Sequence, residues 1–287
     1  MVDVVFTDGP FDGNQLVSWT LKNAAIPGKS TLNLMISSFL LQGLGRTALT
    51  ACVLGIIWGL HSLVLLQCLI HSAGFWTVFP LTDRTIQYLS RWCAYVVALC
   101  TFHLLEFFVT AIYNPTVLNG DSFLVNHSTA YTTAAITSCI EFNIRFLILG
   151  HASWGWVGGL LLVSIGQTLR SLAMATAGQS FHHLIQTSKR DSHVLVTHGI
   201  YHYLRHPSYT GFFYWSVGTQ VLLGNPLHTL AFAAASWTFF RRRIPYEEET
   251  LCRHFPGDYE RYRDTTWIGI PFLDYCIRRD RDGSKED

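Results

Sequence analysis

Hydrophobic residues fall into long runs, separated by short polar connections, along most of the chain. A helix of about 20 apolar residues is long enough to cross the hydrocarbon core of a bilayer. His61 splits one apolar stretch that is too long for a single span. With that split, eight runs can be counted, the first being the shortest: 32–41, 47–60, 62–79, 92–113, 131–149, 154–177, 209–223 and 227–240. The pattern predicts an all-α polytopic membrane protein with about eight transmembrane helices.

The polar segments predict the domain organisation. Residues 1–29 read as a loose N-terminal segment, and residues 30–287 as a single integral-membrane domain. Within this domain the blocks 178–211 and 241–273 are longer and more polar than the other connections. We expect these two blocks to form one face, with a ligand-binding loop and a C-terminal helical segment.

Basic residues predict which side of the membrane this face occupies. The first block contains Lys189, Arg190 and Arg205, and Arg241–Arg243 follows the last span, whereas the connections around Gly150 and Asn225 contain no lysine or arginine. Cytosolic loops carry an excess of such residues. We therefore expect both blocks on the cytosolic side, and an even number of spans places the N-terminus there too.

Composition supports a membrane protein and excludes some other classes. Hydrophobic residues make up 49% of the chain and charged residues 14%, with a mean hydropathy of +0.26, whereas soluble domains average about 25% charged residues. The net charge of +1 and the scattered basic residues do not suggest nucleic acid. The seven cysteines include no C-x-x-C pair, so we expect neither disulfides nor a metal site.

A few polar or small residues inside the predicted spans have structural interpretations. Glu141 and Arg145 are one helical turn apart and are expected to neutralise each other. Glu106 has no evident partner in the sequence. Gly55 and Gly59 suggest a face for close helix packing. Asp83, Arg84 and Arg91 are expected to mark a loop before the 92–113 span.

The block from His198 to Gly211 is the strongest candidate for chemistry. Pro207 suits the first turn of a helix, where its missing N–H would have no partner in any case. The free N–H groups of such a helix start favour an anionic ligand. His206, Ser208 and Tyr209 would then stand at this helix start. The alternative is an interfacial belt of amphipathic residues.

No nucleophile–base pair, metal cluster or phosphate-binding glycine loop is evident, which favours a site that positions two ligands. The segments Leu195–Tyr201 and Arg205–Tyr209, followed by Arg243 and Glu247-Glu248, resemble the isoprenylcysteine carboxyl methyltransferase family. The segments Ala177–His183 and Asp121–Ser128 are similar to that family as well. The similarity extends over roughly residues 90–273.

The resemblance implies an enzyme of the endoplasmic reticulum membrane that uses S-adenosyl-L-methionine. It would methylate the C-terminal carboxylate of a farnesylated or geranylgeranylated cysteine on CaaX-processed proteins such as small GTPases. It implies a catalytic and substrate-binding role for Arg243 and Glu247. It also implies cofactor binding by Gln186, His193, Val194, Leu195, Val196, Tyr201, His206, Pro207, Ser208 and Tyr209.

Other interpretations are open at this point. An Arg-His-Pro-x-Tyr block with paired glutamates also occurs in phospholipid methyltransferases and in NADPH-dependent sterol or lipid reductases. Lys189-Arg190 would be candidates for binding the 2′-phosphate of NADPH. A third possibility is a membrane scaffold whose polar face binds a protein. For Arg243 and Glu247 the simpler alternative is an i,i+4 salt bridge on an exposed helix.

Overall fold

The structure is a computed structural model, and it describes residues 43–74, 82–125, 128–150, 155–183 and 194–277. The chain divides into two compact units, residues 1–53 and 54–287. Only the start of one helix is described in the first unit. The second unit contains every other described element and the candidate site.

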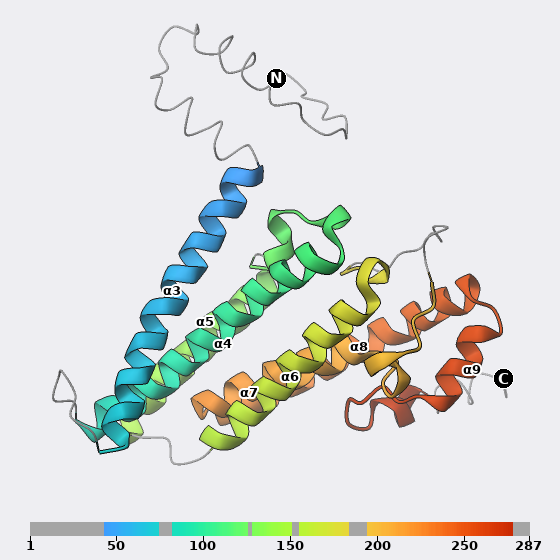
Figure 1. Cartoon of the computed structure of the whole chain (residues 1–287). Helices are drawn as coiled ribbons and strands as arrows, with labels where there is room; N and C mark the ends of the chain where they lie inside the picture. Colours follow the sequence, from blue (N-terminus) through green and yellow to red (C-terminus); the bar gives the residue numbers. More distant parts are fainter. Residues whose placement is uncertain (1–42, 75–81, 126–127, 151–154, 184–193, 278–287) are drawn as a thin grey trace, which may run out of the picture. The chain divides into compact units, whose positions relative to one another are not determined.

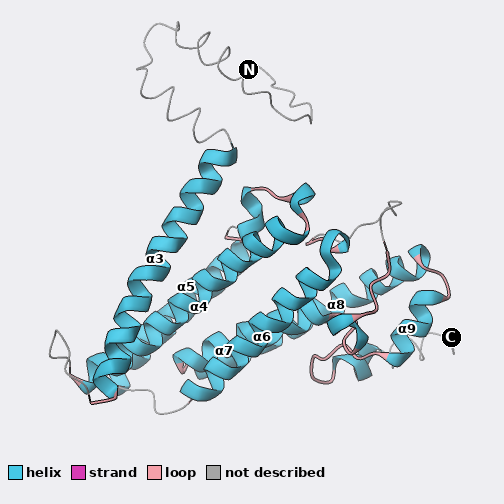
Figure 2. Cartoon of the chain, in the orientation of Figure 1, coloured by secondary structure: helices cyan, strands magenta, loops and turns pink. Residues whose placement is uncertain are grey.

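The described residues form helices and loops with no strand, as Figure 2 shows. Labels follow Figure 1, and the seven α-helices are α3 (Gly43–Ser72), α4 (Asp83–Tyr113), α5 (Thr129–Leu149), α6 (Trp156–Ala177), α7 (Pro207–Leu223), α8 (Pro226–His254) and α9 (Asp258–Thr265). The first four, α3 to α6, are long and apolar enough to cross a membrane. A helical membrane fold is thus confirmed, whereas the count of eight spans is not.

The predicted break at His61 is wrong, because α3 is one continuous helix of 30 residues (Figure 1). His61 lies inside it, and its ring nitrogen Nδ1 bonds to the carbonyl of Ile57 at 2.8 Å. A histidine therefore fits within the helix without ending it. The first predicted run, 32–41, lies outside the described residues.

Helix α4 begins earlier than its apolar run predicts. Thr82 caps its N-terminus, since the Thr82 hydroxyl accepts a hydrogen bond from the N–H of Thr85. Asp83, Arg84 and Arg91 therefore lie in the helix, and the predicted loop is wrong. Arg91 is buried and donates to the carbonyl of Leu222 at the end of α7 (2.7 Å). An arginine can lie inside a span when it satisfies a helix C-terminus in this way.

Helices α6 and α7 pack closely through glycines placed seven residues apart on each helix. An added Cβ at Gly159 would overlap the backbone nitrogen of Leu222, and one at Gly211 would lie 2.6 Å from the nitrogen of Arg170. Gly166 and Gly218 are equally restricted. Small residues allow two backbones to approach in this manner. By contrast, Gly55 and Gly59 have nothing within 4 Å among the described residues, so no described helix packs closely on them.

The predicted pairing of Glu141 with Arg145 is also replaced by another contact. The Glu141 carboxylate accepts the backbone N–H groups of Leu227 and His228 at the start of α8, and it forms an ion pair with the His228 ring. A carboxylate at a helix N-terminus satisfies free N–H groups and interacts favourably with the helix dipole. Glu141 thus joins α5 to α8.

Helix α8 continues through Pro245, although proline removes one backbone hydrogen bond from a helix. Arg243 and Glu247 therefore lie one turn apart on a single helix. The C-terminal segment after α9 packs back on α7 and α8 through a core of buried apolar side chains: Phe213, Phe240, Ile244, Ile268, Ile270, Leu273 and Ile277. This packing holds the polar ends of α7 and α8 together.

Two adjacent glycines test the α6–α7 packing. Gly159→Ala should destabilise the protein by about 1–3 kcal/mol, because its methyl group would force the two backbones apart. Gly158→Ala is the matched control, since Gly158 is exposed and its Cβ would meet nothing within 4 Å. Thermal unfolding of the detergent-purified protein measures both. Equal unfolding midpoints for the two variants would contradict the described packing.

Candidate active site

A cavity of about 260 Å³ lies where the polar ends of the helices meet. Its walls come from α4, the start of α5, α6 and the segment after it, the segment before α7, the start of α7, the second half of α8, and α9. The lining includes most of the residues implied by the resemblance, namely Val194, Leu195, Val196, Tyr201, His206, Pro207, Ser208, Tyr209, Arg243 and Glu247. Gln186 and His193 lie outside the described residues.

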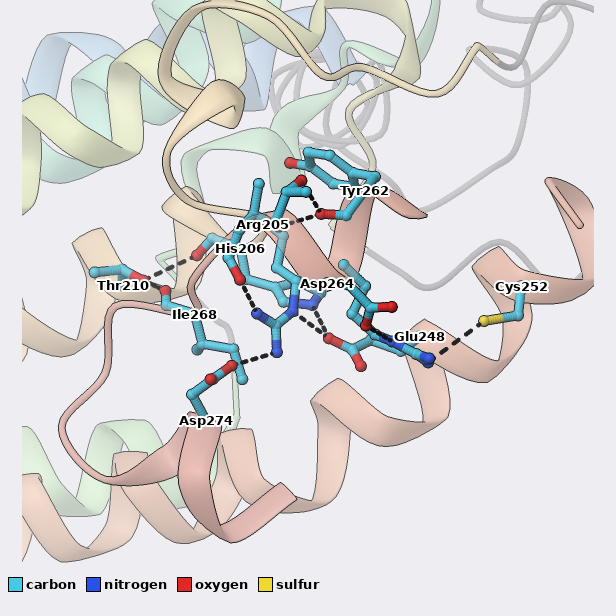
Figure 3. Close-up of polar contacts among 12 residues, drawn as sticks. Arg205, His206, Thr210, Glu248, Cys252, Tyr262, Asp264, Ile268 and Asp274 are labelled. Carbon is cyan, nitrogen blue, oxygen red and sulfur yellow. Dashed lines mark hydrogen bonds and ion pairs between the residues drawn. The ribbon is translucent and has the colours of Figure 1, made fainter. Parts of the chain in front are cut away.

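Arg205 fixes the segment that leads into α7, as Figure 3 shows. Its side chain is fully buried and donates to the carboxylates of Glu248 (2.7 Å) and Asp274 (2.6 Å) and to the carbonyl of Thr266 (2.7 Å). A guanidinium can satisfy several acceptors in one plane. One side chain therefore joins the start of α7, the middle of α8 and the C-terminal segment.

The next residue, His206, is held by the same carboxylate. Its Nε2 lies 3.2 Å from Glu248 Oε1 (Figure 3), and its ring stacks on Tyr209 with a centroid distance of 5.5 Å. Burial alone would raise the pKa of Glu248, but the hydrogen bond and charge of His206, together with the charge of Arg205, lower it to about 2. Glu248 is thus ionised near neutral pH, and it accepts the Nε2 proton of His206.

Tyr209 links the two residues predicted to bind substrate. Arg243 donates its Nε proton to the Tyr209 hydroxyl (2.8 Å), and that hydroxyl donates to Glu247 Oε2. Arg243 also donates to the carbonyl of His183 (2.8 Å). Among the described residues no direct Arg243–Glu247 ion pair is present. The two residues are therefore not a surface salt bridge; Tyr209 connects them within the cavity wall.

A second arginine, Arg170 of α6, lines another part of the cavity. It forms two parallel hydrogen bonds with Glu106 of α4, and both side chains are buried. Its remaining Nη1 donates to the hydroxyl of Ser208 (3.0 Å). Glu106, for which the sequence suggested no partner, is therefore paired with Arg170.

Aromatic side chains form much of the remaining wall. The Tyr262 hydroxyl of α9 donates to the Tyr201 carbonyl (2.6 Å) and so fixes α9 against the segment before α7. Burial raises the pKa of Tyr201 above its ordinary value, so this side chain is neutral. A neutral aromatic wall beside charged groups suits a ligand with both apolar and ionic parts.

Comparisons with known proteins agree with this geometry. The model of the isoprenylcysteine carboxyl methyltransferase family matches residues 159–253, which include most of α6, all of α7 and nearly all of α8. A protein-S-isoprenylcysteine O-methyltransferase of Xenopus laevis is 42% identical over 90% of this chain and 93% of its own length. The chain belongs to the isoprenylcysteine carboxyl methyltransferase family. It is an enzyme that transfers a methyl group.

Further comparisons extend this family assignment to the fold. The human protein-S-isoprenylcysteine O-methyltransferase is 42% identical over 79% of this chain and 75% of its own length. A solved structure of a eukaryotic intramembrane Ras methyltransferase, an isoprenylcysteine carboxyl methyltransferase, is 32% identical, with a TM-score of 0.72. That similarity covers 91% of this chain and 94% of the other. Neither the reductase nor the scaffold alternative is favoured by membership of this methyltransferase family.

Sequence reasoning missed several groups that build the methyltransferase cavity. Arg170 is the only basic residue in the Trp156–Ala177 sequence, and its charge in an apolar run could have been matched with Glu106. From the sequence, Arg205 was used for membrane orientation and as part of the Arg205–Tyr209 motif, and its role as a buried structural residue was not predicted. Tyr259 and Tyr262 of α9 carry no motif, and only the fold brings them to the cavity.

The Glu106–Arg170 pair can be tested by charge removal. Arg170→Met should destabilise the protein by about 3–5 kcal/mol, because it leaves the Glu106 carboxylate buried without a counter-charge. The double variant Glu106→Met/Arg170→Met should recover most of the loss, since apolar residues of similar size can replace a buried ion pair. Thermal unfolding midpoints measure both variants. An Arg170→Met variant that is as stable as the wild type would show that the Glu106–Arg170 ion pair is absent.

Proposed function

We propose that the protein transfers the methyl group of S-adenosyl-L-methionine to the C-terminal carboxylate of a prenylated cysteine. The different surroundings of two of the cavity arginines, Arg170 and Arg243, support this proposal. Arg170 is neutralised by Glu106, whereas the acceptors of Arg243 are a hydroxyl and a carbonyl. Arg243 therefore keeps a positive charge at the cavity wall, where an anionic substrate can bind it.

The described residues also fit the proposed cofactor. The Ser208 hydroxyl accepts from Arg170 and donates to no described residue, so its proton is available to an acceptor at the start of α7. The backbone N–H of Ser208 donates to no described residue, and such a group at a helix start favours a carboxylate at the same place. The ring of Tyr201 lines the cavity and can attract a sulfonium cation. The ring of Tyr209 instead stacks on His206 and Phe240. Gln186 and His193 belong to the same proposal through the resemblance.

Residues of the chain can position this reaction without acting as a base. When bound, S-adenosyl-L-methionine supplies an electrophilic methyl group on a positively charged sulfur. A substrate carboxylate, with a reference pKa of about 3.5, is already ionised near neutral pH. Arg243 would hold one carboxylate oxygen and leave the other oxygen unbound as the nucleophile. Transfer of the methyl group would leave S-adenosylhomocysteine, and no proton has to be removed. The chain contributes orientation and the exclusion of water, and His206 accordingly serves to shape the cavity.

The apolar helices and the basic residues beside the cavity suit the two proposed substrates. Helices α3 to α6 are apolar enough for the bilayer, which would dissolve a farnesyl or geranylgeranyl chain. The cavity lies beside the basic end of α8, and such residues favour the cytosolic side. We accordingly propose that the site faces the cytosol. The endoplasmic reticulum membrane is the location that the resemblance implies. The enzyme's substrates would be CaaX-processed proteins such as small GTPases.

A methyl-transfer assay tests the proposal. Detergent-purified protein should transfer labelled methyl from S-adenosyl-L-methionine to N-acetyl-farnesylcysteine and form a base-labile ester. Arg243→Ala should lower kcat/KM at least tenfold, about 1.4 kcal/mol, because a charged hydrogen-bonding partner of the carboxylate is lost.

Arg242→Ala is the matched control. Arg242 is the exposed neighbour of Arg243 and does not line the cavity, so this variant should keep near-normal activity. Absence of the labelled ester with wild-type protein would contradict the proposed reaction. Equal activity of the two variants would contradict the role of Arg243.

A further inference from the structure

The hydroxyl of Tyr259 is buried and has no hydrogen-bond partner among the described residues. Tyr259 lies in the first turn of α9, is 1% exposed and lines the cavity. Buried polar groups nearly always have a partner, because an unsatisfied one destabilises the fold. An unsatisfied hydroxyl in a cavity wall therefore points to a ligand that supplies the missing partner.

A second tyrosine on the same helix has a hydroxyl that does form a hydrogen bond. Tyr262 is one turn further along α9, its ring centroid is 5.9 Å from that of Tyr259, and it also lines the cavity. Its hydroxyl donates to the carbonyl of Tyr201 at 2.6 Å. The Tyr262 hydroxyl therefore has its hydrogen-bond partner within the chain, whereas the Tyr259 hydroxyl has none among the described residues.

The surroundings of Tyr259 limit the kind of group that can bind there. Burial raises the pKa of Tyr259 well above its ordinary value, the nearby carboxylate of Glu248 raises it further, and the positive charge of Arg205 partly opposes this effect. The hydroxyl therefore keeps its proton and acts as a donor. Glu248 and Arg205 neutralise each other, so they leave no unpaired charge to bind an ionic group. Leu251 and Phe255 add apolar wall. A neutral, aromatic group with hydrogen-bond acceptors fits this part of the cavity.

We infer that the Tyr259 hydroxyl donates a hydrogen bond to the nucleoside part of S-adenosyl-L-methionine. This inference rests on the proposed function. It locates the nucleoside end of the cofactor beside α9. A nucleoside is neutral, has a flat aromatic base and offers ring-nitrogen and ribose-oxygen acceptors. The carboxylate of the cofactor is directed instead to the start of α7, where Ser208 and Arg170 lie.

Tyr259→Phe removes the hydroxyl and keeps the ring. Titration calorimetry of the full, detergent-purified chain should show about threefold to tenfold weaker binding of S-adenosylhomocysteine, as expected for the loss of one hydrogen bond. Binding of 5′-methylthioadenosine, which has the nucleoside but no amino-acid part, should weaken by the same factor. Without ligand, the unfolding midpoint of Tyr259→Phe should equal or exceed that of the wild type, because an unsatisfied buried group is removed.

Tyr262→Phe is the matched control. Its unfolding midpoint without ligand should fall, since it leaves the Tyr201 carbonyl without its donor. A fall of the same size in Tyr259→Phe, or unchanged binding of S-adenosylhomocysteine, would overturn the inference. Weaker binding of S-adenosylhomocysteine alone would also overturn it, because the contact would not be with the nucleoside. Wild-type protein that binds neither probe would contradict the proposed function instead.

Discussion

The cavity depends on the buried guanidinium of Arg205. This group binds Glu248 of α8, Asp274 of the C-terminal segment and the carbonyl of Thr266 (Figure 3), while its own backbone N–H donates to the carbonyl of Trp267. A buried charge is stable only when its partners are well placed. The position of each segment is thereby fixed relative to the start of α7. The stacked rings of His206 and Tyr209, which line the cavity, follow directly from this arrangement.

Charge is distributed unevenly around the cavity, and this distribution separates structural from functional arginines. Arg170 and Arg205 are both buried and both paired with carboxylates. Arg243 is half-buried, and its hydrogen bonds go to neutral groups. The first two hold α4, α6, α7 and α8 in place around the cavity, and the third can bind an anion. A site that receives a charged substrate beside the membrane needs both kinds.

Much of the cavity could be predicted from the sequence, and the exceptions have physical reasons. The motif around His206 and Arg243 is local, and the described residues implied by the resemblance do line one cavity. The break at His61 failed because a histidine can bond within its own helix. Glu141 bonds to the start of α8 rather than to Arg145 one turn away, because the start of α8 offers two N–H groups that have no partner within that helix. Tyr259 comes from α9, and no local pattern predicts such a long-range contact.

Hydrogen exchange measured by mass spectrometry, with and without S-adenosylhomocysteine, tests the central claim that this cavity binds the cofactor. The protected peptides should cover residues 194–211 and 243–263, whose backbones form the segment before α7, the end of α8 and α9. Exchange in α3, which does not line the cavity, should not change. Binding of S-adenosylhomocysteine that leaves exchange in 194–211 and 243–263 unaltered would contradict the account.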